Sequence, residues 1–200
     1  MEFELLNKER HAVRTFDGVK IPTDTIKEIL MDAHLAPSGM NIQSWHFVIV
    51  EDKNKLAALL EEVKPQNRKQ IEEAGAVVVL FGDQDLVARS LEMGEFEEDE
   101  LKKERLMTRY PLMFEGFSEE YLNTYLSIST GLVTMNLMYV IKNRGYEGNI
   151  ILEFNRTSKI NEILDVDMRY RPELIIPFGA SLDTGEASFR FPSERVIEVR

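Results

Sequence analysis

Three polar loops hold the residues of this 200-residue sequence that are best suited to binding and chemistry. They span residues 10–14 (RHAVR), 36–45 (APSGMNIQSW) and 144–149 (RGYEGN). Guanidinium groups, side-chain amides and backbone N–H groups of this kind can hold a polar, planar ligand. An anionic cofactor needs basic residues that cluster locally. Arg10 and Arg14 form such a cluster in a chain whose formal net charge is −11.

Other common kinds of chemistry find little support. The sequence has no cysteine, which excludes disulfides, thiolate metal sites, iron–sulfur clusters and cysteine nucleophiles. Its three histidines, His11, His34 and His46, show no metal-ligand spacing, so no metal site is expected. A P-loop, a GxGxxG turn and a GxSxG elbow are all missing, and acidic pairs such as Glu97 and Glu98 are ordinary in a charged helix. A dedicated nucleotide-binding domain is therefore not expected.

Composition and charge limit the class of protein. Apolar residues at 44% and charged residues at 30% are typical of a globular chain, and the length suits one domain over residues 1–200. The negative net charge argues against nonspecific binding to nucleic acid or to anionic membranes. The opening residues, MEFELLNKER, lack the apolar run of a signal peptide, which predicts a cytoplasmic protein.

Helices and short strands alternate, which predicts one α+β domain. A helix at 23–35 is amphipathic, with Thr23 as the expected N-cap and Pro37 after its end. The unbroken apolar run at 76–83 is typical of a strand buried on both faces. The other expected helices cover 2–10, 53–63, 66–74, 118–144 and 156–164, the other strands cover 45–51, 150–154 and 173–181, and an extended polar tail follows at 183–200.

The long helix needs a membrane check, because residues 122–141 carry no charged side chain over a length that could cross a bilayer. Seven asparagine, serine and threonine side chains make this segment too polar for lipid, so a buried core helix is predicted. Apolar residues recur along it at spacings of four and three, which suits packing in a core or in a dimer interface. They are Tyr121, Tyr125, Ile128, Leu132, Met135 and Tyr139.

Residues 84–120 are rich in Glu and Lys. Such a charge run usually marks a solvated helical face, and that interpretation is favoured here. The alternative is a mobile insertion over a site, in which residues 86–117 form a lid and determine the acceptor. Tyr110, Phe114 and Phe117 fit packing better than a lid.

Two segments carry a family resemblance. Residues 10–16 (RHAVRTF) resemble the R-[RH]-S-x-[RK]-x-F opening of the nitroreductase family, and residues 36–47 (APSGMNIQSWHF) resemble its A-P-S-x-x-N-x-Q-P-W-x-F loop. Order and spacing agree. Asn67 with Gln70, the Gly145–Gly148 turn after a long helix, and the 190–192 segment (RFP) extend the resemblance over nearly the whole chain.

The resemblance implies an α+β fold in which helices flank a mixed central sheet, with the long helix at a homodimer interface. It also implies FMN at each subunit interface and NADH or NADPH as co-substrate. Hydride passes to N5 of the flavin and then to a nitro, quinone or related acceptor in ping-pong fashion. No side-chain acid or base is needed for that transfer, so no catalytic side chain is assigned.

Roles transfer position by position, as the resemblance implies. The family residues that bind the FMN phosphate and ribityl chain correspond to Arg10, His11, Ala12 and Arg190. The basic residue at the flavin N1–O2 edge corresponds to Arg14, and the residues at the pyrimidine edge of the ring correspond to Asn67 and Gln70. The residues whose backbone N–H groups face N5 correspond to Glu147 and Gly148. The residues that the other subunit contributes correspond to Ser38, Met40 and Asn41, with Gln43 beside them.

Four positions depart from the family pattern. Ala12 replaces a serine, and Ser188 stands where some members have a second basic residue; both changes predict weaker FMN retention. Gln70 is neutral where others have lysine, which leaves the charge near N1 to Arg14 and predicts a milder oxidant. Ser44 replaces a common proline.

Alternatives of another class stay open at this point. The chain could store FMN or sense redox state without turnover, or it could be a protein-interaction module whose polar loops bind nothing. Each loop residue also has a structural interpretation, as a helix-end cation (Arg10, Arg14), a loop-backbone partner (Asn41, Gln43) or an exposed helix residue (Asn67, Gln70). Trp45 is expected in the core, and His46 is expected to be structural.

Overall fold

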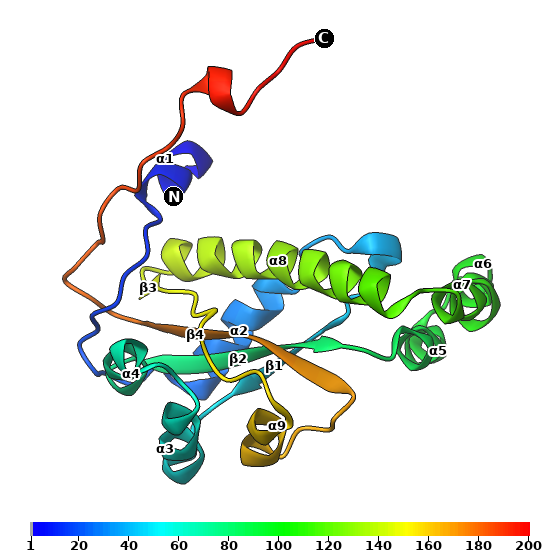
Figure 1. The fold of residues 1–200 in the computed structure, drawn as a ribbon, viewed down its shortest axis with the longest axis horizontal. Coiled ribbons are helices and arrows are strands. Elements are labelled where there is room, and N and C mark those ends of the chain that lie inside the picture. Colours follow the sequence, from blue (N-terminus) through cyan, green and yellow to red (C-terminus); the bar gives the residue numbers. More distant parts are fainter. Residues whose placement is uncertain (1) are drawn as a thin grey trace.

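The structure is a computed structural model that describes residues 2–200. A four-stranded sheet lies between two layers of helices, with α8 on one face and α3, α4 and α9 on the other (Figure 1). The strand order is β1-β2-β4-β3. The bounds are Trp45–Ile49 for β1, Ala76–Asp83 for β2, Glu147–Gly148 for β3 and Tyr170–Gly179 for β4.

The described strand pairings are all antiparallel. The α+β fold expected from the sequence is confirmed, but the sheet is antiparallel here where a mixed one was expected. The predicted strand at 150–154 makes only isolated antiparallel bridges, such as Ile151 with Ile175. The extended tail leaves the body and adds no strand to this sheet. Strand β2 is buried along its whole length, as its apolar run predicts.

On the first face, α8 (Glu119–Asn143) packs with α2 (Thr23–Ala33) against the sheet. Helix α8 is long and apolar enough to cross a membrane. Its inner side instead packs through Val133, Leu137 and Ile141 in the same core cluster as α2 and the sheet, so it is a core helix of this fold.

The predicted N-cap of α2 is wrong by one residue. Pro22 occupies the N-cap, and Thr23 is the first helical residue. The Thr23 hydroxyl donates to the Glu51 carboxylate instead of capping the helix, because that carboxylate lies beside it.

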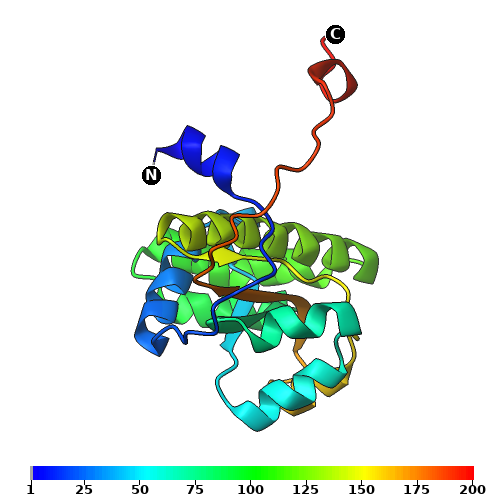
Figure 2. The same cartoon turned by 90° about the vertical axis from the view of Figure 1, so that its left-hand side faces the viewer.

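The second face is covered by three short helices, visible below the sheet in Figure 2. They pack Leu59, Ile71 and Ile160 against the side chains of β2 and β4 that point to this face. Their bounds are Lys53–Glu61 for α3, Pro65–Glu72 for α4 and Ser158–Leu164 for α9.

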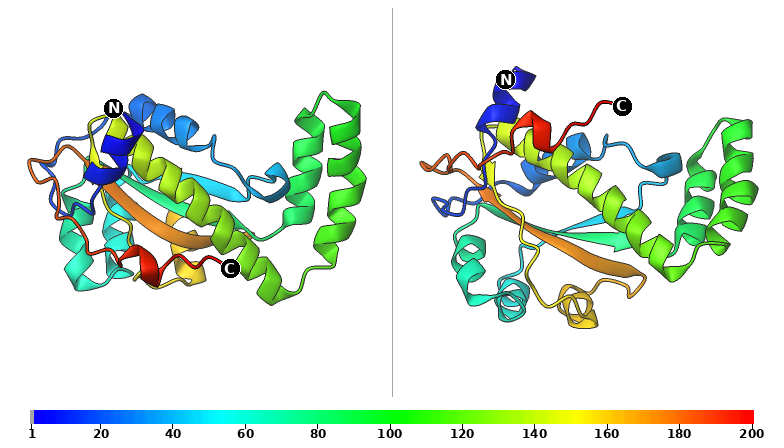
Figure 3. Two further views of the ribbon diagram at one scale, coloured as in Figure 1. Left: turned by 90° about the horizontal axis from the view of Figure 1, so that it is seen from above. Right: turned by 45° about the horizontal axis from the view of Figure 1, so that its top comes forward.

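Residues 86–115 form a helical arm that projects beyond the end of the sheet (Figure 3). The charge run predicted as helical is helical except at residues 97–99, which join α5 to α6, and Phe114 packs with Tyr110 and Phe117 as expected. A π-helical turn precedes Pro111, which has no N–H to donate to the carbonyl four residues earlier. The arm comprises α5 (Leu86–Phe96), α6 (Glu100–Glu104), the π-turn (Arg105–Arg109) and α7 (Tyr110–Glu115).

Both ends of the chain leave the body on the α8 side of the sheet (Figures 1 and 2). Helix α1 spans Phe3–Glu9, and the tail after Ser181 contains one short turn, Ser193–Arg195. Apolar side chains of the tail face solvent in the single chain; Phe191, for example, is 65% exposed.

Candidate functional site

The first and third polar loops meet at the edge of the sheet. The N–H of Val13 donates to the carbonyl of Gly148 at 3.1 Å, and Val13 itself is fully buried. Strand β3 pairs with β4 on its other side. The backbone therefore fixes residues 10–14 beside residues 147–149, which the sequence separates by more than one hundred positions.

The start of the tail closes this edge into an open cavity of about 520 Å³. Gly185 has φ of +75°, and a Cβ there would lie 2.8 Å from the Cβ of His11, so the close approach requires glycine. The His11 ring lies 3.3 Å from the carbonyl of Thr184. The cavity is lined by Ala12, Arg14, Asp183, Gly185, Glu186, Ala187 and Ser188.

Two arginines at this edge have unused donors among the described residues. The Arg10 Nε atom is buried without a hydrogen-bond partner. Arg14 is exposed at the cavity and makes none of the hydrogen bonds or ion pairs found in residues 2–200. A buried donor without a partner is unfavourable, so an oxyanion at this position would stabilise it.

A chain of amides runs from β3 to α4. The Asn149 side chain donates to Oε1 of Gln70 at 2.7 Å, and Gln70 donates to Oδ1 of Asn67 at 2.9 Å. Gln70 is buried, and both of its polar atoms are engaged. Asn67 is half-buried at the end of the chain, so it is the amide of the two that is better placed for a ligand. We call residues 10–14, 67–70 and 147–149 the strand-anchored half-site.

A buried ion pair supports this half-site. Lys142, at the end of α8, contacts the Glu147 carboxylate, and the two side chains are 10% and 11% exposed. Gly145, at φ +84°, makes the turn between them possible. The sequence analysis did not identify Lys142. The only sequence signal for it is that a basic residue at a helix end precedes an acidic residue by five positions, with a glycine turn between them.

The second polar loop has a strained backbone. Met40, Asn41 and Gln43 have φ of 52°, 55° and 50°, a left-handed region that side chains disfavour. Within the loop, the N–H of Gln43 donates to the Ser38 hydroxyl at 2.9 Å. We call residues 38–43 the pinned loop, because side chains from elsewhere in the chain also fix it.

Tyr125 of α8 fixes the start of the pinned loop. Its hydroxyl donates to the Gly39 carbonyl at 2.6 Å. Burial, and after it the neighbouring Tyr121 hydroxyl, raises the pKa of Tyr125 to about 12. The phenol therefore remains a proton donor at any ordinary pH.

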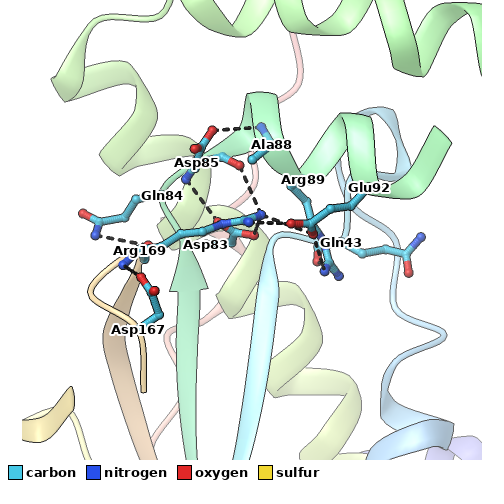
Figure 4. A network of polar contacts seen from close by, with 9 residues as sticks. All are labelled: Gln43, Asp83, Gln84, Asp85, Ala88, Arg89, Glu92, Asp167 and Arg169. Atoms are coloured by element: carbon cyan, nitrogen blue, oxygen red, sulfur yellow. Dashed lines mark hydrogen bonds and ion pairs between the residues drawn. The ribbon is translucent and has the colours of Figure 1, made fainter. Parts of the chain in front are cut away.

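Arg89 of α5 fixes the end of the pinned loop, donating from Nη2 to the Gln43 carbonyl at 3.0 Å (Figure 4). Arg89 belongs to a polar network at the base of the helical arm. In it, Arg169 makes two 2.6 Å bonds to Asp83 and one 2.6 Å bond to Glu92. Sequence reasoning missed these residues, because 86 positions separate Asp83 from Arg169.

The two regions lie far apart in one chain. Tyr125 contacts Gly39, whereas Met138 packs against Gly148, where a Cβ would lie 3.3 Å from the Met138 methyl carbon. Thirteen positions of one straight helix separate the two contacts, which is about 20 Å at 1.5 Å per residue. The pinned loop therefore does not reach the strand-anchored half-site of its own chain.

Two predicted site features lie elsewhere. Arg190 is in the exposed tail, where it donates to the carbonyls of Ser188 and Phe189. Met40 and Asn41 face the helical arm across a second cavity of about 390 Å³. The rest of that cavity is lined by Met93, Glu97, Lys102, Arg105, Leu106 and Tyr110.

The two residues with structural predictions are found as expected. Trp45 is buried in the core, and its Nε1 donates to Nδ1 of His34 at 2.9 Å. His46 stacks on the Tyr170 ring, and its pKa is lowered by burial and by the charge of Arg89.

Comparison with known proteins gives consistent matches. A sequence model described as Nitroreductase family matches residues 8–180. A candidate NAD(P)H nitroreductase of Streptococcus pyogenes is 39% identical over 203 residues, covering 100% of both chains. An enone reductase of conjugated linoleic acid (CLA) biosynthesis from Lactiplantibacillus plantarum is 31% identical, over 85% of this chain and 81% of its own.

Solved structures agree with these matches. A nitroreductase family protein of Streptococcus pneumoniae superposes with a TM-score of 0.94 at 35% identity, covering 100% of both chains. A candidate nitroreductase of Exiguobacterium sibiricum, solved in complex with FMN, has a TM-score of 0.92 at 27% identity, over 100% of this chain and 98% of its own.

Proposed function

The chain belongs to the nitroreductase family, and from this premise we propose that residues 1–200 form one FMN-binding domain that reduces a small acceptor by a ping-pong reaction. It is an FMN-dependent NAD(P)H oxidoreductase. The acceptor is a nitro compound, a quinone or a related molecule. The enzyme acts in the cytoplasm, where its nicotinamide co-substrate is available.

The observation that carries the proposal is the junction of residues 10–14 with β3. It places two basic side chains at one sheet edge: Arg10, whose buried Nε has no hydrogen-bond partner among residues 2–200, and Arg14, which lines the open cavity. Guanidinium donors suit phosphate oxygens, and a cavity of this size is within the range of cofactor sites. The residues present therefore fit FMN, with Arg10 and His11 at the phosphate and ribityl chain. Ala12 contributes backbone only.

Each residue of the half-site has a proposed task toward the flavin. When bound, FMN accepts a hydride at N5 and passes it on. Arg14 stabilises the negative charge that gathers near N1 on reduction. Asn67 presents its amide to the pyrimidine edge, and Gln70 holds Asn67 in position.

Strand geometry distinguishes Glu147 from Gly148, the two residues whose backbone N–H groups were expected to face flavin N5. In a strand, the N–H and C=O of one residue point to the same edge. The Gly148 carbonyl accepts from Val13, so the Gly148 N–H also faces residues 10–14. The Asn149 N–H donates to the Pro177 carbonyl of β4. Because every second residue of a strand faces the same edge, Glu147 also faces β4. We therefore assign the N5 contact to Gly148.

A homodimer completes the site in this proposal. The outer side of α8 exposes the apolar seam of the sequence; Ile128, for example, is 60% exposed. The tail exposes further apolar residues, and the pinned loop lies about 20 Å from the half-site of its own chain. A second copy would cover the seam and bring its Ser38, Met40, Asn41 and Gln43 to the flavin. Arg190 reaches the phosphate only if the tail follows the assembled dimer.

An absorbance spectrum of the purified protein tests the function, followed by anaerobic addition of NADH and then NADPH. We expect bound or reconstituted FMN whose bands bleach, and a dimer by light scattering. Nitro, quinone and enone acceptors are then compared, since the Lactiplantibacillus plantarum relative is named an enone reductase. Bands that do not bleach would indicate FMN storage or sensing, and a protein that takes up no FMN would refute the proposal.

A further inference from the structure

The pinned loop does not hold its shape by local backbone preference. Three of its residues have positive φ without being glycine, and such outliers persist only where surrounding contacts over-determine them. Asparagine tolerates left-handed φ and ψ angles better than most residues, but Met40 and Gln43 do not share that tolerance. Hydrogen bonds within the loop and contacts from other parts of the chain therefore hold it together.

The Gln43 backbone is held through both its N–H and its carbonyl. The N–H donates to Ser38 within the loop, and the carbonyl accepts from the nearby Trp45 N–H and from the Arg89 side chain of α5. At the other end of the loop, Tyr125 holds the Gly39 carbonyl. Two side chains, from α5 and α8, thus fix the first and last parts of the strained segment from outside.

Among residues 2–200, Arg89 makes no other strong polar contact. Its ion pair with Glu92 is 4.0 Å long, and its Nε is buried without a partner. Glu92 and Asp83 are already satisfied by Arg169. Figure 4 shows Arg89 reaching away from Arg169 toward Gln43. The guanidinium is therefore not needed to neutralise the network, and its defined contact is with the loop carbonyl.

We propose that Arg89 and Tyr125 are positioning residues that hold the pinned loop in the conformation that binds FMN in the partner subunit. The cofactor part of this proposal rests on the proposed function, in which the loop supplies Ser38, Asn41 and Gln43. Arg89 acts through the loop backbone and does not touch the flavin. Since Arg89 lies on α5, it also fixes the loop to the helical arm that lines the second cavity.

Arg89→Met is the sharpest test, because it removes the bond to Gln43 and leaves no buried carboxylate unpaired. Amide hydrogen exchange of the holoenzyme should rise in residues 38–43 but not in β2. The Kd for FMN should rise about tenfold, as expected for the loss of one charge-assisted hydrogen bond. Arg89→Lys, which keeps one donor, should restore most of the affinity, and Tyr125→Phe should repeat the effect at the other end.

Arg156→Met is the matched control. Arg156 also donates to a backbone carbonyl, that of Leu152 at 3.3 Å, and its guanidinium lies over the Phe154 ring. It belongs neither to the pinned loop nor to the strand-anchored half-site, so we expect unchanged FMN affinity and unchanged exchange at 38–43. Equal loss of FMN in the Arg156 and Arg89 variants, or unchanged exchange at 38–43 in Arg89→Met, would overturn the proposal.

Failure of the proposed function gives a different result. If the wild-type protein takes up no FMN, the cofactor role of the loop is wrong. Amide exchange at residues 38–43 in Arg89→Met still decides whether Arg89 positions the loop.

Discussion

The strand-anchored half-site and the pinned loop hold their shapes by different means. Residues 147–149 lie between β4 and residues 10–14, and regular backbone hydrogen bonds fix them. The pinned loop has three strained residues and depends on side chains from α5 and α8. One region is part of the sheet, whereas the other combines its own short-range hydrogen bonds with contacts from distant side chains. Substitutions of side chains should therefore disturb the two regions to different degrees.

The largest difference should come from the buried ion pairs near each region. Arg169→Met leaves Asp83, which is fully buried, without its bidentate partner and should lower the free energy of unfolding by about 3–5 kcal/mol. Lys142→Met removes one contact from the buried Glu147 carboxylate and should lower the free energy of unfolding by about 3 kcal/mol. Urea unfolding of both variants measures this. The double variants with Asp83→Asn and Glu147→Gln should recover stability; no recovery would show that charge burial is not the cause.

Glycine substitutions should come next, and here the strand-anchored half-site should be the more sensitive. A Cβ at Gly185 would lie 2.8 Å from His11 and 3.0 Å from the Ala12 carbonyl, at a positive φ. The three atoms nearest to a Cβ at Gly39 would all belong to the Tyr125 side chain, from 2.6 Å, and Gly39 lies outside the left-handed region, so one side chain must shift and give up its bond to the Gly39 carbonyl. Gly185→Ala should lower the free energy of unfolding by about 2–3 kcal/mol and Gly39→Ala by about 1 kcal/mol. Thermal unfolding measures both, and the reverse order would contradict the assumed rigidity of the sheet edge.

Arg14→Ala tests the electrostatic role within the strand-anchored half-site. Its guanidinium makes no hydrogen bond or ion pair found in residues 2–200, so stability should be unchanged. The rate of flavin reduction by NADH or NADPH should fall about tenfold, more than the affinity for FMN falls. Arg190→Ala should show the opposite, with weaker FMN retention and little change in reduction rate. An unchanged reduction rate in Arg14→Ala would remove Arg14 from the N1 edge.

The smallest effect should be a pH dependence on the side of the pinned loop. Burial, and then the charge of Arg89, lowers the pKa of His34 below its ordinary value of 6.5. The unfolded chain therefore binds the proton first, and this part of the stability is complete above pH 6.5 and is lost as pH falls toward the lower folded pKa. Protonation also removes the acceptor for Trp45.

The fluorescence of Trp45, the only tryptophan, should report this change below pH 6.5 in the wild type. It should be absent in His34→Gln. A midpoint above 6.5 would contradict the direction of the shift.

Much of the fold could be predicted from local patterns. The apolar periodicity of α2 and α8 and the unbroken run of β2 identify elements whose burial is set by their own sequence. The two-residue strand β3 gives no such pattern, because it depends on β4 and on Val13 for its hydrogen bonds.

The candidate site was predictable only in part. The residues of the polar loops could be named from type and resemblance, yet the contacts that hold them could not. Arg89 reaches Gln43 across 46 positions, and the positive φ of Met40 carries no signature such as glycine. The amide chain that engages Gln70 needs Asn149, 79 positions away. Such pairings follow from tertiary packing, which a single sequence does not encode in any local period.

The length of α8 has a genetic consequence. If one chain supplies its half-site and its loop at opposite ends of this helix, they serve two different flavins in the proposed dimer. A chain damaged in residues 10–14 and a chain damaged in residues 38–43 would then complement each other. Their mixed dimer holds one intact centre and one doubly damaged centre, so two inactive proteins, dissociated and reassociated together, would regain activity that neither parent has.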